Sequence, residues 1–152
     1  MSIVQTQTTS FKKELYQGIH DLSTDVIKIA LYTANANINA DTTVYSSVDE
    51  VVAAGYTATG EILTPVTISS SGYTAYVSFP NVSWTAALTA RCALIYNSSQ
   101  ADRSIAVLDF GSDKTSTTLF TITMPADTST AALLGVQIDC YHDQRRYGRL
   151  FA

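Results

Sequence analysis

The spacing of apolar residues near the N-terminus predicts one short helix. Four apolar side chains recur at intervals of four, four and three, which places them on one face: Phe11, Leu15, Ile19 and Leu22. This stripe corresponds to about three helical turns. Ser10 stands where an N-cap belongs, since its hydroxyl can accept a hydrogen bond from the first turn. Residues 1–9 have no helical period, so we expect an extended arm before the helix.

After Asp25 the pattern changes to short apolar segments separated by turn formers. Residues 26–33 are β-branched and almost continuously apolar, which predicts a strand followed by a polar loop over 34–47. Residues 48–54 instead suggest a short helix closed by Gly55. Further strands are expected near 61–68, 73–79, 88–96, 103–110, 117–124 and 132–140. Pro65 should place its strand at a sheet edge or beside a bulge.

Strands of this length, with turns every 8–12 residues or so, are typical of a sandwich or a barrel. We therefore expect a mostly β fold, namely a single-domain, jelly-roll-like β-sandwich with one N-terminal α-helix and extended terminal arms. The arm covers residues 1–9, the domain covers 10–140, and a basic, aromatic tail covers 141–152.

Charge is scarce in this sequence. Charged residues make up 14% of the 152 residues, whereas about a quarter is usual in soluble proteins. Either much of the surface contacts other protein, or hydroxyl groups keep it soluble. Residues 1–140 carry 6 basic and 12 acidic side chains, and such an acidic body argues against nucleic-acid binding.

The sequence also bears on location. No apolar run approaches the roughly 20 residues of a membrane-spanning helix, and the opening residues lack the basic and apolar regions of a signal peptide. We therefore expect synthesis in a cytoplasm, with no membrane partner. In that compartment Cys92 and Cys140 should be buried free thiols, although a disulfide between them stays an alternative.

Candidate chemistry is sparse, and we expect no catalytic, cofactor-binding or metal-binding residues. The common nucleophile, zinc, phosphate-loop and dinucleotide motifs are all missing from the sequence. His20 and His142 are better explained as solvated or interface side chains than as general bases. Asp102, Asp109 and Asp113 lack the density of a calcium loop, and Asp109 to Asp113 looks like a turn instead.

Aromatic and arginine side chains suggest contact surfaces. Trp84, with Tyr73, Tyr76 and Phe79, could form a sugar-stacking platform, or could divide between the core and a subunit contact. Arg and Tyr are enriched at binding hot spots, which favours an interface anchor in the tail. The interface residues expected on these grounds are Trp84, Arg145, Arg146, Tyr147, Arg149, Leu150 and Phe151.

Residues 10–45 read SFKKELYQGIHDLSTDVIKIALYTANANINADTTVY, and this segment resembles a family of small tailed-bacteriophage and prophage virion proteins. Family members commonly begin SFKxELLxGxHDF, followed by TDxxKIALYT and a loop rich in asparagine, alanine and threonine. The likeness continues through EVVAAGYTATGEILT, VSWTAALTARCALIYNSS and IAVLDFGSDKTST, and so covers about residues 10–120. The arm and the tail depart from the family pattern.

The resemblance implies a structural subunit of a virus particle, made in a bacterial cytoplasm. We expect a capsid cement or decoration protein on the head surface, bound to copies of itself as a trimer and to the major capsid protein or other virion proteins. A tail, neck or fibre-attachment subunit is the alternative, followed by a glycan-binding module on a tail fibre.

Overall fold

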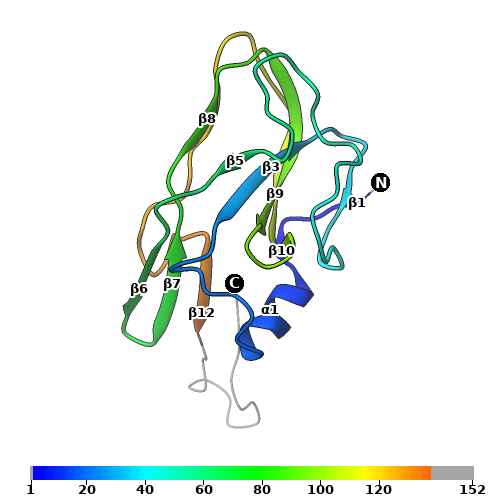
Figure 1. Ribbon diagram of the computed structural model, residues 1–152. Helices are drawn as coiled ribbons and strands as arrows, with labels where there is room; N and C mark the ends of the chain where they lie inside the picture. The colour runs from blue at the N-terminus through cyan, green and yellow to red at the C-terminus, as the bar shows by residue number, and fades with distance from the viewer. Residues whose placement is uncertain (1, 138–152) are drawn as a thin grey trace.

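The computed structural model describes residues 2–137, and within them the chain is mostly β, with 43% strand and 6% helix (Figure 1). One short helix near the N-terminus and several antiparallel sheets make up the fold. The elements in chain order are β1 (Ser2–Ile3), β2 (Thr6–Gln7), α1 (Thr9–Tyr16), β3 (Ile27–Tyr32), β4 (Asn37–Ile38), β5 (Glu61–Ile62), β6 (Thr67–Ser71), β7 (Thr74–Ser78), β8 (Val82–Trp84), β9 (Leu88–Asn97), β10 (Arg103–Ser116), β11 (Phe120–Ile122) and β12 (Leu134–Gln137).

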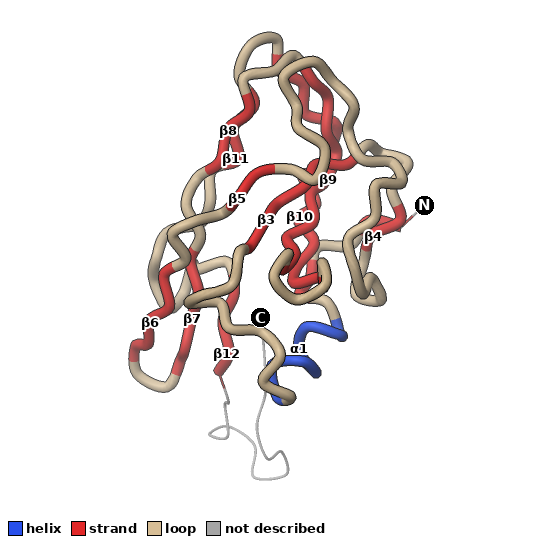
Figure 2. Tube along the Cα trace, in the orientation of Figure 1, coloured by secondary structure: helices blue, strands red, loops and turns tan. Residues whose placement is uncertain are grey.

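The largest sheet has five strands in the order β2-β10-β9-β3-β5, and every pairing in it is antiparallel. Strand β9 is central, with β10 along one side and β3 along the other. A second group of strands forms a three-stranded sheet, β12-β7-β6, and a two-stranded sheet, β11-β8. Figure 2 shows these smaller sheets beside the central strands, with α1 at the lower end of the molecule.

The main core lies between the large sheet and the two smaller sheets. From the large sheet it takes Ile27, Ile29 and Leu31 of β3, which alternate with residues that face away. From the smaller sheets and their connections it takes Phe79, Val82, Trp84, Phe120, Ile122 and Leu134. A second cluster, with Tyr32, Leu94, Tyr96 and Val107, covers the opposite face of the large sheet.

The helix is shorter than the apolar spacing suggested. It spans Thr9–Tyr16, and Thr8 rather than Ser10 is its N-cap, because the Thr8 hydroxyl accepts a hydrogen bond from the Phe11 amide at 3.3 Å. Gly18 then adopts φ +68°, a left-handed conformation that ends the helix. Phe11 and Leu22 of the expected stripe are buried, but Leu22 reaches the core from the loop after the helix.

The segment expected to form an N-terminal arm is extended, but it pairs within the domain. Strand β1 lies parallel to β4, and β2 is antiparallel to β10, with Thr6 and Gln7 opposite Val107 and Ala106. Thr8 is fully buried. A boundary at residue 9 therefore does not separate a projecting arm from the domain.

The expected helix over 48–54 is absent, because this segment follows β3 instead. The Val51 amide donates to the Leu31 carbonyl at 2.9 Å, and the Asp49 carbonyl accepts from the Thr33 amide at 2.9 Å. Asp49 also has φ +62°, which a helix does not allow. Backbone bonding to a neighbouring strand has replaced the helical bonds of this segment.

The expected strands are present with adjusted limits. The segment 61–68 divides at Pro65 into β5 and β6, each an edge strand of its sheet, as expected for a proline. Strand β8 falls in a segment that the sequence indicated as a turn. Strand β10 runs on to Ser116 through a bulge between Asp109 and Lys114.

The structure describes one of the two cysteines. Cys92 lies in β9 as a free, fully buried thiol, as expected. Burial, together with the nearby Asp109 carboxylate, raises the pKa of this thiol to about 12. It is therefore protonated and unreactive at neutral pH. Cys140 lies outside the described residues.

Gly60 is required where the segment after residue 50 returns to the large sheet. Its φ is +76°, and a Cβ at this position would overlap the carbonyl oxygen of Ile29 in β3. Gly72 also has a positive φ, +58°, but a Cβ there would meet nothing within 4 Å. A substitution would therefore strain the backbone at both positions, but only at Gly60 would it also clash with a neighbour.

We predict that Gly60→Ala lowers the free energy of unfolding by about 3 kcal/mol, since it adds a backbone clash to the left-handed strain. Gly72→Ala is the control and should cost about 1 kcal/mol, from strain alone. Urea unfolding followed by the fluorescence of Trp84 measures both. Equal losses for the two variants would contradict the close approach at Gly60.

Candidate functional site

Trp84 is not an exposed anchor, which corrects its assignment to an interface. Its side chain is 2% exposed and lies in the core, with ring centres 6.0 Å from Tyr56 and 6.1 Å from Phe120. Phe79 is buried as well, whereas Tyr73 is 93% exposed. The four aromatic residues therefore do not form a common stacking platform. The strand alternation of β8 turns Trp84 inward.

The other residues expected at an interface lie outside the described residues. These are Arg145, Arg146, Tyr147, Arg149, Leu150 and Phe151. His142 lies outside them too.

His20 belongs to a buried network of hydrogen-bonded side chains and does not lie at the surface. Its Nε2 lies 2.7 Å from Glu14 Oε2, and its Nδ1 lies 3.1 Å from the side-chain nitrogen of Asn97. The Asn97 amide nitrogen also donates to Asp25 Oδ2 at 2.6 Å, and its oxygen accepts from the Ser99 amide at 3.0 Å. The amide orientation of Asn97 is therefore fixed, so its nitrogen donates to His20 Nδ1, and Nε2 is the ring nitrogen that donates to Glu14.

This network of buried polar side chains attaches α1 to the large sheet. Glu14 comes from α1, Asn97 ends β9, and Arg103 at the start of β10 donates to Glu14 Oε1 at 2.7 Å. The left-handed turn at Gly18 brings His20 back against Glu14. The carboxylate and imidazole resemble a catalytic pair, but the group on the far side of the ring is an amide, which is no nucleophile. The arrangement holds the helix in place.

A second buried carboxylate, Glu50, holds the long segment between β4 and β5. Glu50 Oε2 accepts from the Tyr45 hydroxyl at 2.6 Å, and Oε1 accepts from the Tyr56 hydroxyl at 2.7 Å and the Thr59 amide at 2.8 Å. The Tyr56 oxygen accepts in turn from the Leu31 amide of β3 at 2.9 Å. Glu50 thus connects three points of this segment to the large sheet.

The tyrosines around Glu50 resist ionisation. Burial raises the pKa of Tyr45 and of Tyr56 well above the ordinary value, and hydrogen bonds to the Glu50 carboxylate raise both further. Burial also raises the pKa of Tyr96 to about 12, and this ring stacks on Tyr45 with centres 4.8 Å apart. The cluster suits structural support.

Metal ligation finds no support among residues 2–137, where no group of three His, Cys, Asp or Glu side chains is arranged to hold an ion. Asp109 accepts from the Gly111 amide at 2.8 Å and pairs with Arg91 at 3.2 Å. Asp109 lies within β10, where the bulge begins, so the turn expected from Asp109 to Asp113 is an irregularity inside a strand instead. Within the same part of the chain, no helix is long and apolar enough to cross a membrane.

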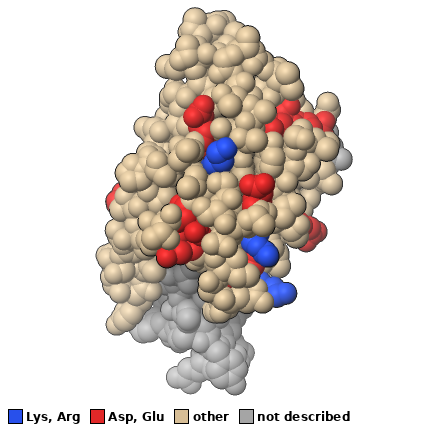
Figure 3. All heavy atoms as spheres, viewed as in Figure 1, with Lys and Arg blue, Asp and Glu red and all other residues tan. Residues whose placement is uncertain are grey.

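One end of the molecule carries no charge. It consists of residues 51–53, 85–89 and 115–119, which we call the uncharged end. Figure 3 shows charged side chains over the middle and lower parts of one face and none at the upper end, where Figure 1 shows the connections β8–β9 and β10–β11. Val52 is 97% exposed there, and Leu119 is 56% exposed.

The uncharged end is also hollowed. A groove of about 460 Å³ runs between its three segments, lined by Thr33, Val51, Val52, Ala53, Ala87, Leu88, Thr89, Thr115 and Ser116. Hydrogen bonds of hydroxyl groups fix its walls. The hydroxyl oxygens of Thr89 and Thr115 lie 2.9 Å apart, and the Ser116 hydroxyl donates to the Ala86 carbonyl at 2.7 Å. An uncharged, preformed surface of this kind is suited to contact with another protein.

The uncharged end was not predicted from the sequence, although the sequence contains a signal for it. No charged residue occurs from 62 to 90 or from 115 to 126. Overall charge content hides this pattern, because the charges collect in the other parts of the chain.

Comparison with known proteins found no matching family model, no matching curated protein and no matching solved structure.

We predict that stability falls as pH rises above 10.0, the ordinary tyrosine value. The pKa values of Tyr45 and Tyr56 are raised in the folded chain, so their contribution is complete below the unfolded value and is lost as pH rises toward the folded values. Tyr56→Phe should lower the free energy of unfolding by about 1–2 kcal/mol at neutral pH, because hydrogen bonds are lost. It should also make stability fall less steeply with rising alkaline pH.

Urea unfolding at a series of alkaline pH values measures this slope. Tyr73→Phe is the matched control, because Tyr73 is exposed and should leave both the neutral stability and the slope unchanged. An unchanged slope in Tyr56→Phe would show that the Glu50 cluster does not set the alkaline limit.

Proposed function

We propose that this protein is a structural subunit of a bacteriophage virion, acting as a capsid cement or decoration protein. The observation that carries the proposal is the uncharged end, with Val52 exposed on the rim of its groove. The resemblance of residues 10–120 to small phage virion proteins supports a place in a virus particle. Buried acids that serve as anchors, rather than reactive groups, support a structural role.

The mechanism is added contact area at the joints between capsid subunits. Contact cores in protein interfaces are depleted of charge, which matches the uncharged end. An ordinary interface buries about 1,600 Å², and repetition over a lattice makes individually weak contacts collectively strong. The partners are copies of this chain, arranged as a trimer, and the major capsid protein. The site of action is the virion surface.

We further propose that the layers form a β-sandwich. Residues of β3 on one side and of β8, β11 and β12 on the other meet in one apolar core, which supports two facing layers. The jelly-roll connection order stays an expectation from the sequence.

A tail, neck or fibre-attachment subunit is the second candidate, and copy number separates the two. On the order of hundreds of copies per particle indicates a head lattice or tail tube, and about a dozen or fewer indicates a neck, baseplate or fibre, because closed rings hold few subunits. A glycan-binding module loses its main residue, since Trp84 is buried.

We predict that Val52→Lys reduces occupancy on phage particles by about tenfold or more, because a charge enters an uncharged contact. The isolated chain should keep its melting temperature, since Val52 is 97% exposed. Quantitative mass spectrometry of purified particles measures occupancy.

Tyr73→Lys is the matched control. Tyr73 is 93% exposed in the β6–β7 turn, outside the uncharged end, so the same new charge there should leave occupancy unchanged. Full occupancy of Val52→Lys would remove the uncharged end from the attachment mechanism.

A further inference from the structure

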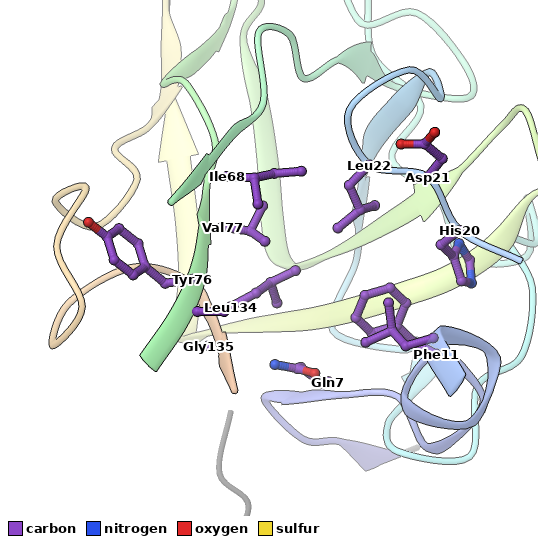
Figure 4. Close-up of a pocket in the computed structure, with 12 residues that line it drawn as sticks. Gln7, Phe11, His20, Asp21, Leu22, Ile68, Tyr76, Val77, Leu134 and Gly135 are labelled. Carbon is purple, nitrogen blue, oxygen red and sulfur yellow. The ribbon is translucent and has the colours of Figure 1, made fainter. Parts of the chain in front are cut away.

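A second groove, of about 510 Å³, lies at the opposite end of the molecule, between α1 with the loop that follows it and the three-stranded sheet (Figure 4). We call it the lower groove. Its lining is mainly apolar: Phe11, Leu15 and Leu22 on the helix side, and Ile68, Val77 and Leu134 on the sheet side. Ile68 is 52% exposed and Leu15 is 37% exposed, so the walls leave apolar surface open.

A buried polar group faces this groove without a partner. Gln7 lines the groove, is only 5% exposed, and its Nε2 finds no hydrogen-bond partner within the part of the chain that the structure describes. Figure 4 shows the Gln7 amide between β12 and Phe11 of α1. A buried amide nitrogen without an acceptor is costly, so the site suits an occupant that brings a carbonyl oxygen.

Two strand edges border the same space. Strand β12 is an edge of the three-stranded sheet, and β2 is an edge of the five-stranded sheet. Gly135 of β12 and Gln7 of β2 both line the lower groove. Open strand edges offer backbone donors and acceptors to an extended segment, which is the usual way a peptide joins a sheet.

We propose that the occupant of the lower groove is the C-terminal segment of this same chain, residues 138–152. Both the position and the composition of this segment suit the groove. The described chain ends at Gln137, two residues beyond Gly135 in the wall of the groove. The segment that follows contains five large apolar or aromatic residues able to fill it: Ile138, Tyr141, Tyr147, Leu150 and Phe151.

Attachment favours the chain's own segment over that of a neighbour. A short tether gives an effective concentration of about millimolar, above the concentration of a second copy in ordinary solution. Charge is complementary as well: the segment carries Arg145, Arg146 and Arg149 against Asp139 and Asp143, whereas residues 1–137 carry 6 basic and 11 acidic side chains and Asp21 lines the groove. This inference does not depend on the proposed function. It gives the tail an intramolecular role in the free subunit.

Limited trypsin digestion of the full chain tests the proposal. A docked segment protects the bonds after Arg145, Arg146 and Arg149, and Ile68→Ser should raise cleavage there by about tenfold, because it removes apolar contact from the groove. Ile62→Ser is the matched control: Ile62 is also 52% exposed and lies in an edge strand, but it does not line the groove. Trypsin cleavage of Ile62→Ser after the three arginines should match that of the parent chain.

A second pair of variants protects the test against misfolding of Ile68→Ser, which circular dichroism would reveal. Leu15→Ser alters the opposite wall and should also raise cleavage, whereas Tyr16→Ser, at the neighbouring exposed residue, should not. Equal cleavage in the parent chain and in the folded groove variants overturns the proposal. Protection that increases with protein concentration also overturns it, because the occupant would then be the segment of a second copy.

Discussion

The fold depends on the pairing of β9 with a strand on each side. Strand β9 is ten residues long, and β10 and β3 bond to its two edges. Its residues Ala93 and Ile95 enter the main core, while Cys92, Leu94 and Tyr96 enter the second cluster. A strand that is apolar on both faces must be covered on both, so the smaller sheets are needed on one side and the loop with Tyr45 on the other.

Segments outside the sheets are attached to this centre by two buried carboxylates. Glu14 receives His20 and Arg103 and holds α1 against the ends of β9 and β10. Glu50 receives two tyrosine hydroxyls and one amide, and holds the segment between β4 and β5 against β3. In both cases the acid is fully hydrogen-bonded, which makes its burial tolerable. Polar groups thus supply geometric precision where apolar contact alone would allow sliding.

The two ends of the molecule differ in a way that bears on function. The uncharged end presents threonines, alanines and valines with few polar groups that need a partner, which suits contact with a protein surface. In the lower groove the Gln7 amide nitrogen has no partner among residues 2–137, and the edge strands β2 and β12 border the space, which suits an extended segment. The proposed attachment to neighbouring subunits and the proposed docking of an extended segment thus involve opposite ends of the molecule.

The sequence by itself determined the class of fold and most of its strands. The β-branched, apolar and aromatic residues of 26–33, 73–79 and 88–96 are a local property of the chain, and turn-forming residues mark where those strands stop. Tertiary structure decided what local pattern cannot express. Residues 48–54 form no helix because their backbone bonds to β3. Trp84 faces inward because β11 and Tyr56 cover it. His20 is buried because the turn at Gly18 directs it toward Glu14. Each outcome depends on partners distant in sequence, and burial is a property of what packs against a residue rather than of the residue itself.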